Sequence, residues 1–163
     1  MKQMMPGSLT LDIVTMPRPV LSVPIRQLIV RSFEGELAIL AGHMPLMALL
    51  LPCVVQIFPI PSDVRKGESG VDEIRDSVFI SGGVLEVQPQ RVIILAEEAL
   101  FADEINIEHA RAALVDAHRR MRENFLMEDR ERARIEVMSA QAQIDLWQWN
   151  QARVAYQPSL IPT

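Results

Sequence analysis

The amino-acid sequence predicts an all-β flattened sandwich or barrel of about ten antiparallel strands, followed by a C-terminal antiparallel α-helical hairpin. Before residue 104, the apolar residues alternate with polar ones or form short runs that proline and glycine interrupt, which is typical of strands and turns. After residue 104, apolar residues recur every three or four positions, which is typical of amphipathic helices. The predicted parts are a β domain over residues 1–103, a helical hairpin over 104–155 and a loose tail over 156–163.

The first predicted strand is "LTLDIVT", in which Leu9, Leu11 and Ile13 share one face while Thr10 and Asp12 point to the other. Further strands are expected in "IRQLIVRS" (25–32), in "CVVQIFPI" (53–60), and in three strands of "SVFISGGVLEVQPQRVIILAEEA", the last of which covers Arg91–Leu95. The polar, proline-free segment Ser62–Ser77 is expected to be a surface loop.

Two apolar stripes predict the helices. The first consists of Ile107, Ala110, Leu114, Ala117 and Met121, and the second of Ala133, Val137, Ala140, Ile144 and Trp147. Asn106 is the expected N-cap of the first helix, and a polar break over residues 122–124 separates the two. Because both stripes are rich in alanine, the hairpin should bury little area and be only marginally stable by itself.

Composition excludes several classes of protein. A net charge of −5 over 163 residues argues against general nucleic-acid binding, which needs an excess of basic side chains. The single cysteine, Cys53, excludes an internal disulfide and lies in an apolar run typical of a buried side chain. The apolar run from Leu46 to Phe58 is shorter than the roughly 20 residues of a membrane-spanning helix. We also expect no secretory signal peptide, because residues 1–8 lead into no apolar core.

Catalytic and metal-binding motifs are weak throughout the sequence. His109 and His118 are nine positions apart, whereas two metal ligands on adjacent helical turns would be four apart. Phosphate-binding loops, dinucleotide fingerprints and nucleophile elbows do not occur, so we expect no catalytic residues and no metal. A small hydrolase that uses His43 with a carboxylate remains an alternative, which activity of the purified chain would support.

The charged run "RRMRENFLMEDRERARIE" has two interpretations. A solvated helical face of mixed sign is the common one. The other is a surface for a partner protein on a mobile arm, and the pattern does not separate them.

Two stretches, in this order, resemble the epsilon subunit of F-type ATP synthases, which is called delta in mitochondria. The segment "EGELAILAGHMPLMALLLPCVV" is similar to the family's Glu-Gly-Glu-Leu-Gly-Ile-Leu-Pro-Gly-His-Ala-Pro-Leu pattern, and "ISGGVLEVQPQRVIILAEEA" to its Ser-Gly-Gly-Phe-Leu-Glu-Val strand pair. The resemblance extends from about Leu9 to Trp147. Ala38 and Cys53 replace usual glycines and Ala41 a usual proline, which is typical of a divergent member.

The resemblance implies a non-catalytic central-stalk subunit that couples rotation of the proton-driven c-ring to the gamma subunit. It implies Glu36, Gly42 and His43 as c-ring contacts, so His43 is expected to be neither catalytic nor metal-bound. The helical hairpin would extend transiently toward the alpha and beta catalytic subunits and inhibit ATP hydrolysis. Arg130, Arg132 and Arg134 are its expected contacts there, because they would present cations to acidic surfaces.

Some bacterial members bind ATP through an Ile/Leu-Asp-x-x-Arg-Ala motif at the start of the first helix. "IEHARA" is similar, with Glu108 in place of the aspartate and Arg111 as the arginine, and Arg119 follows about two turns later. The expectation is that no cofactor is required and that regulatory ATP binding at these residues, if present, is weak; an ordinary solvent-facing arginine is favoured.

The expected location is the cytoplasmic face of a bacterial inner membrane, or the organellar equivalent, with attachment through the complex and not by insertion. A free-standing β-sandwich adaptor that self-associates through its helices is the alternative function.

Overall fold

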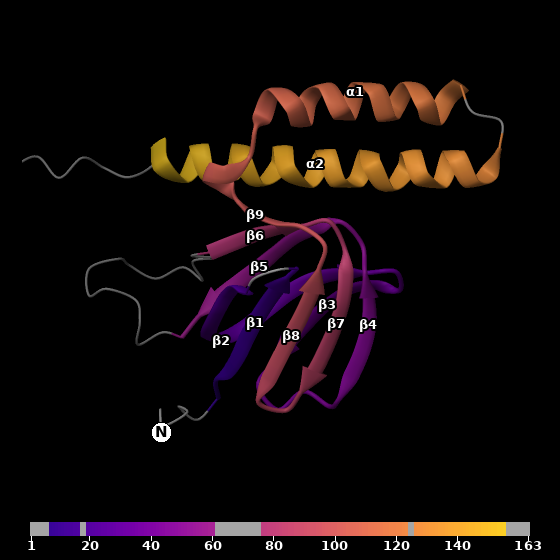
Figure 1. Cartoon of the computed structure of the whole chain (residues 1–163). Coiled ribbons are helices and arrows are strands. Elements are labelled where there is room, and N and C mark those ends of the chain that lie inside the picture. The colour runs from indigo at the N-terminus through magenta and orange to yellow at the C-terminus, as the bar shows by residue number, and fades with distance from the viewer. Residues whose placement is uncertain (1–6, 17–18, 61–75, 124–125, 156–163) are drawn as a thin grey trace, which may run out of the picture.

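The computed structural model describes residues 7–16, 19–60, 76–123 and 126–155. Over these residues the chain forms nine strands, a short 3-10 helix and two α-helices (Figure 1). In chain order they are β1 (Leu9–Thr15), β2 (Pro19–Ser32), β3 (Gly35–Leu40), β4 (Leu46–Leu50), β5 (Cys53–Pro59), β6 (Asp76–Ile80), β7 (Gly83–Gln88), β8 (Arg91–Ala96), β9 (Ala99–Phe101), η2 (Ala102–Glu104), α1 (Ile107–Glu123) and α2 (Met127–Ala155). The predicted β sandwich followed by a helical hairpin is confirmed, with nine described strands where about ten were expected.

The strands are hydrogen-bonded in the order β1-β8-β7-β4-β2-β5-β6-β9, with β3 paired to β2 and a further pairing between β1 and β2. Because β1 contacts both β8 and β2, the first five strands of this order close into a ring. Strand β2 is long enough to pair with β1 through Pro19–Ile25 and with β3 through Gln27–Ser32. The described pairings are antiparallel except β1–β8, which is parallel.

The core lies inside this strand body. The predicted alternation in β1 is confirmed, since Leu9, Leu11 and Ile13 are all fully buried. Burial of each such side chain contributes about 1.5–3 kcal/mol relative to exposure. Cys53 is also buried, and desolvation raises the pKa of its thiol, so it behaves as a small apolar side chain.

Some boundaries differ from those that the sequence predicts. Strand β2 begins at Pro19 and not at Ile25. Strand β6 begins at Asp76, so the end of the predicted surface loop is strand, while residues 61–75 lie outside the described residues, as does the predicted tail.

The helical hairpin forms as predicted. The backbone N–H of His109 donates to Oδ1 of Asn106 at 3.0 Å, which confirms the N-cap. Both predicted stripes face each other across the hairpin, with Ala110 and Ala117 of α1 and Ala133, Ala140 and Ile144 of α2 buried.

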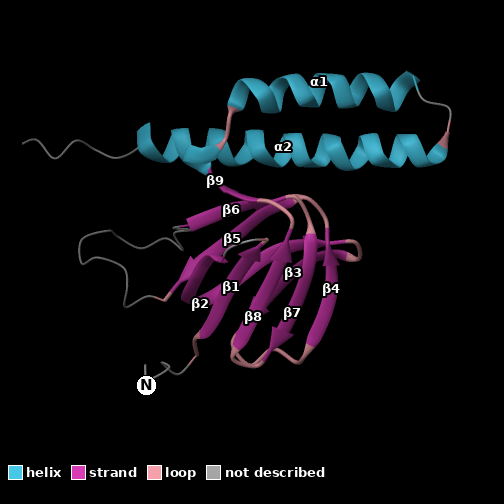
Figure 2. Cartoon of the chain, viewed as in Figure 1, coloured by secondary structure: helices cyan, strands magenta, loops and turns pink. Residues whose placement is uncertain are grey.

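Helix α2 lies between α1 and the sandwich (Figure 2). It therefore has a second apolar face, on which Ala142 and Leu146 pack against Phe79 of β6 and Ile105. This face holds the hairpin against the end of the sandwich formed by β5 and β6. None of the helices in the described part of the chain is long and apolar enough to cross a membrane.

Candidate functional site

Strand β3 carries the first group of candidate residues. Among the described strands it pairs with β2 alone, so its other edge is open. The side chains of Glu36, Ala38 and Leu40 alternate with inward-facing ones and form an exposed row, while Ile39 is buried. This row is available to a partner without disturbing the core.

Gly42 and His43 form a turn immediately after β3. Gly42 has a φ of +80°, which a glycine adopts without strain, and its N–H donates to the carbonyl of Pro89 at 2.8 Å. The Nδ1 of His43 donates to the carbonyl of Met44 at 2.8 Å. Because Pro89 belongs to the turn between β7 and β8, the Gly42–His43 turn lies at the end of the sandwich away from the helices (Figure 1).

Two of the predicted c-ring contacts, Glu36 and His43, are therefore separated in the structure. Glu36 lies near the start of β3, and His43 follows its end. At roughly 3.3 Å per residue the strand from Glu36 to Leu40 spans about 13 Å. The N–H of His43 then donates to the carbonyl of Leu40 at 3.1 Å, so His43 lies at the far end of β3 from Glu36. Within the described residues, no group of three or more His, Cys, Asp and Glu side chains is placed to hold a metal ion, so His43 has no such cluster around it.

An exposed apolar face was missed by the sequence analysis. Leu49 of β4, Val84 of β7 and Leu95 of β8 are in register across three strands, so their side chains point to the same side. Leu49 is 62% exposed and Leu95 is 52% exposed, and Met47 lies two positions before Leu49 with similar exposure. We call Met47, Leu49, Val84 and Leu95 the β4–β7–β8 face.

Phe33 lies beside Leu49 in the backbone. Its N–H donates to the carbonyl of Leu49 at 3.1 Å, and its ring is exposed. Contiguous exposed apolar side chains rimmed by polar ones mark interaction sites. The sequence signal was the run Leu46–Leu50, in which both alternating faces are apolar, so that one face must meet solvent or a partner.

The three candidate nucleotide residues on α1 do not converge. Glu108 is exposed in the first turn, and Arg111 lies over the ring of Trp147 at 5.8 Å from its centroid. Arg119 lies about 12 Å further along the helix. There it donates to Asp116 at 2.5 Å and to Glu123 at 2.9 Å. The Arg119 hydrogen bond holds the pKa of the Asp116 carboxyl below its usual range.

The three candidate arginines at the start of α2 are exposed, but they do not share one side of the helix. Arg130 and Arg134 are four residues apart and lie on one side, whereas Arg132 points in roughly the opposite direction. Arg134 contacts Glu131 at 3.4 Å. Arg132 instead lines a shallow hollow with Ile135.

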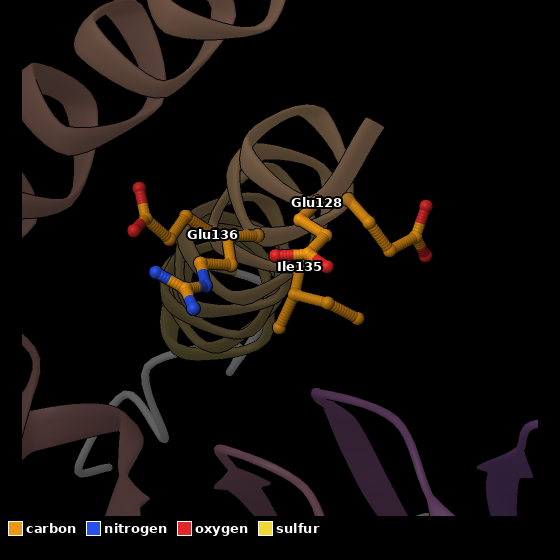
Figure 3. Close-up of a pocket in the computed structure, with 5 residues that line it drawn as sticks. Glu128, Ile135 and Glu136 are labelled. Carbon is orange, nitrogen blue, oxygen red and sulfur yellow. The ribbon is translucent and has the colours of Figure 1, made fainter. Parts of the chain in front are cut away.

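Figure 3 shows this hollow, with Glu128 and Glu136 projecting to opposite sides of Ile135. Glu136 is paired with Arg120 of α1, an ion pair that joins the two helices. The hollow is therefore lined by charged groups around one apolar side chain.

Comparisons with known proteins agree on one family. A family model described as "ATP synthase, Delta/Epsilon chain, beta-sandwich domain" matches residues 8–102. The ATP synthase epsilon chain of Acinetobacter baumannii is 37% identical over 108 residues, which cover 66% of this chain and 67% of that protein. The epsilon chain of Dehalococcoides mccartyi is 37% identical over 120 residues, covering 74% of this chain and 77% of the relative.

Solved structures share the fold. A chain in the cryo-EM structure of the Euglena gracilis mitochondrial ATP synthase (OSCP/F1/c-ring) is similar with a TM-score of 0.63 and 22% identity, covering 94% of this chain and 86% of that one. A chain in the central stalk/c-ring structure from Tetrahymena thermophila has a TM-score of 0.51 and 15% identity, covering 87% and 95% respectively. Both likenesses extend beyond the sandwich, since they cover most of the chain.

Proposed function

Because this chain belongs to the epsilon (mitochondrial delta) subunit family of F-type ATP synthases, we propose that it is a non-catalytic subunit of the central stalk. In this role it couples rotation of the proton-driven c-ring to the gamma subunit. It is held at the membrane through the complex. The observation that carries the proposal is the β4–β7–β8 face, a surface built for a protein partner and not for a small substrate.

The gamma subunit binds the β4–β7–β8 face. Leu49 and Leu95 are exposed although both belong to regular strands, and Glu86 lies beside Met47 as a polar neighbour. An apolar centre with a polar rim is the usual anatomy of a protein interface. Burial of these side chains by gamma would stabilise the complex without rearrangement of the sandwich.

The c-ring contacts the exposed row of β3 and the turn that follows it. Since Glu36 and His43 lie at opposite ends of the strand, this contact runs along β3 and is not one point. Gly42 and His43 form the part of this contact that lies farthest from the helices. This arrangement is consistent with a c-ring at that end of the sandwich and with catalytic subunits on the side of the hairpin.

The hairpin restrains ATP hydrolysis by extending toward the catalytic subunits. Arg130 and Arg134 share one side of α2 and would meet acidic surfaces together, whereas Arg132 faces another way. Among the described residues of α2, the face that holds the hairpin to the sandwich has two buried side chains, Ala142 and Leu146. Small differences in binding energy are therefore sufficient to shift the hairpin between docked and extended forms.

Binding to purified gamma subunit tests the central proposal. The double variant Leu49→Ser/Leu95→Ser should bind gamma roughly tenfold or more weakly, because truncating central interface residues costs above about 1 kcal/mol each. Val115→Ser is the matched control, since Val115 is 70% exposed on α1 and far from the face. Unchanged affinity of the double variant, with its circular dichroism intact, would contradict a gamma site on this face.

A further inference from the structure

We propose that Arg111 closes the helical hairpin by binding the ring of Trp147, and that it is not a nucleotide ligand in this chain. The Arg111–Trp147 pair joins α1 to α2 at the part of α2 that packs against the sandwich. The inference concerns the isolated chain, so it does not depend on the proposed inhibition of ATP hydrolysis.

Trp147 contributes to two apolar clusters at once. On one side it packs with Phe79, Ile105 and Leu146, the cluster that holds α2 against the sandwich. On the other side it packs with the cluster of Ile107, Ala110 and Ile144 between the two helices. Displacement of this one ring therefore weakens both the hairpin and its attachment.

Arg111 approaches that ring from α1. Its guanidinium carbon lies 5.8 Å from the ring centroid, within the range of a cation–π interaction. Tryptophan is the most favourable ring for such a contact, and the guanidinium also covers apolar ring surface that would otherwise meet water. Arg111 follows Ala110, whose side chain is buried in the hairpin, so the backbone at this point is held close to α2.

The surroundings of Arg111 do not suit a polyphosphate. A phosphate group would have to draw the guanidinium away from Trp147. The next candidate cation, Arg119, is about 12 Å away along the helix and already contacts the carboxylates of Asp116 and Glu123. Glu108, one turn before Arg111, adds a negative charge that repels phosphate. The helix start thus lacks the converging cations that phosphate recognition requires.

Trp149 and Arg153 supply a matched control. Arg153 lies over the Trp149 ring at 5.5 Å, so the chemical pair is the same. Both residues belong to α2, however, and this pair joins no two elements. Loss of this cation–π contact within α2 should therefore affect neither the contact between the helices nor the attachment of the hairpin.

The experiment measures thermal melts of the full chain for Arg111→Met, Arg111→Lys and Arg153→Met. Arg111→Met keeps an apolar stem but removes the cation, and should lower the melting midpoint by about 2–4 °C. Arg111→Lys should lose less, because it retains a charge over the ring. Arg153→Met should shift the midpoint clearly less than Arg111→Met. In a Trp149→Phe background, where Trp147 is the remaining tryptophan, Arg111→Met should also shift the emission to the red and increase quenching by acrylamide.

Nucleotide provides the second arm of the experiment. Addition of millimolar magnesium ATP should change neither the melting midpoint nor the Trp147 emission of the parent chain. Two results would overturn the proposal. One is an ATP-dependent rise in the midpoint that Arg111→Met abolishes, which would make Arg111 a nucleotide ligand. The other is an equal effect of Arg111→Met and Arg153→Met, which would leave the Arg111–Trp147 pair without a role in closing the hairpin.

Discussion

The guanidinium of Arg91 donates through Nε to Oδ2 of Asp12 at 2.7 Å, between the parallel strands β1 and β8. The Asp12 side chain is 11% exposed and that of Arg91 is 58% exposed. The alternation of side chains in the sequence predicts that Asp12 points outward from β1. In the structure its carboxylate is nevertheless mostly buried, and the ion pair with Arg91 compensates for the loss of water. A largely covered carboxylate depends on such a partner.

Removal of Arg91 should therefore destabilise the sandwich. Arg91→Ala should lower the free energy of unfolding by about 1 kcal/mol, a modest value because the arginine is largely solvated. Asp12→Asn/Arg91→Ala should recover part of this loss, since no charge is then left without a partner. Urea unfolding of Arg91→Ala, of Asp12→Asn and of the double variant measures the coupling energy between the two side chains. Strictly additive losses would show that the ion pair does not stabilise the β1–β8 pairing.

Gly83 is a second point of sensitivity, where β7 passes close to β8. An added Cβ there would lie 2.0 Å from the carbonyl oxygen of Leu95, and the φ of Gly83 is +142°. Gly83→Ala should destabilise the chain by more than the roughly 1–3 kcal/mol expected from backbone strain alone, because the strands must also move apart. Gly35→Ala is the control, since Gly35 has a φ of +131° and nothing within 4 Å of its Cβ position. Similar urea midpoints for the two variants would mean that the close approach is easily relaxed.

Glu36 and His43 should act independently in binding the c-ring. Glu36→Ala and His43→Ala should each weaken attachment of the chain to ring-containing complexes, and their free-energy losses should add, because the residues lie at opposite ends of β3, more than about 10 Å apart. Neither variant should unfold the isolated chain, since both positions lie at the surface. Co-sedimentation with the ring measures attachment. Unfolding of the isolated chain by either single substitution would make that residue structural and refute its assignment to the ring.

Arg130 and Arg134 should restrain hydrolysis together. Arg130→Ala/Arg134→Ala should raise ATP hydrolysis by the assembled complex roughly fivefold, as expected from the loss of two solvated charge pairs. Arg132→Ala is the matched control and should change hydrolysis little, because this side chain faces away from the other two.

Truncation after Ala102 removes the whole hairpin and gives the upper limit of that increase. Hydrolysis is measured over a range of nucleotide concentrations, with ATP synthesis followed in parallel. Equal hydrolysis by truncated and full-length complexes would refute an inhibitory role and leave the hairpin as packing.

Features that depend on local pattern could be predicted from the sequence. The bounds of β1, Leu9–Thr15, follow from the alternation of its side chains, and the N-cap at Asn106 follows from one residue and its position. Both helices were predicted because their stripes repeat within a few residues.

Features that depend on distant segments could not be predicted. The predicted strand began at Ile25, yet β2 extends back to Pro19 because β1 pairs alongside that segment. The second apolar face of α2, with Ala142 and Leu146, lies outside the predicted stripe, since Leu146 has a partner only once Phe79 of β6 is brought beneath it. Likewise, Leu49 and Leu95 become one surface only through the register of β4, β7 and β8.

Strand β2 has a mechanical consequence for a subunit of a rotating machine. Its 14 residues hydrogen-bond to β1 at one end and to β3 and β5 at the other, and the ring of strands closes through it. A force applied to the open edge of β3 is therefore transmitted to β1 through the continuous backbone of β2. Deformation of the sandwich would require several backbone hydrogen bonds between strands to break together. The closed strand body is therefore expected to resist deformation as one block, to which α2 holds the hairpin.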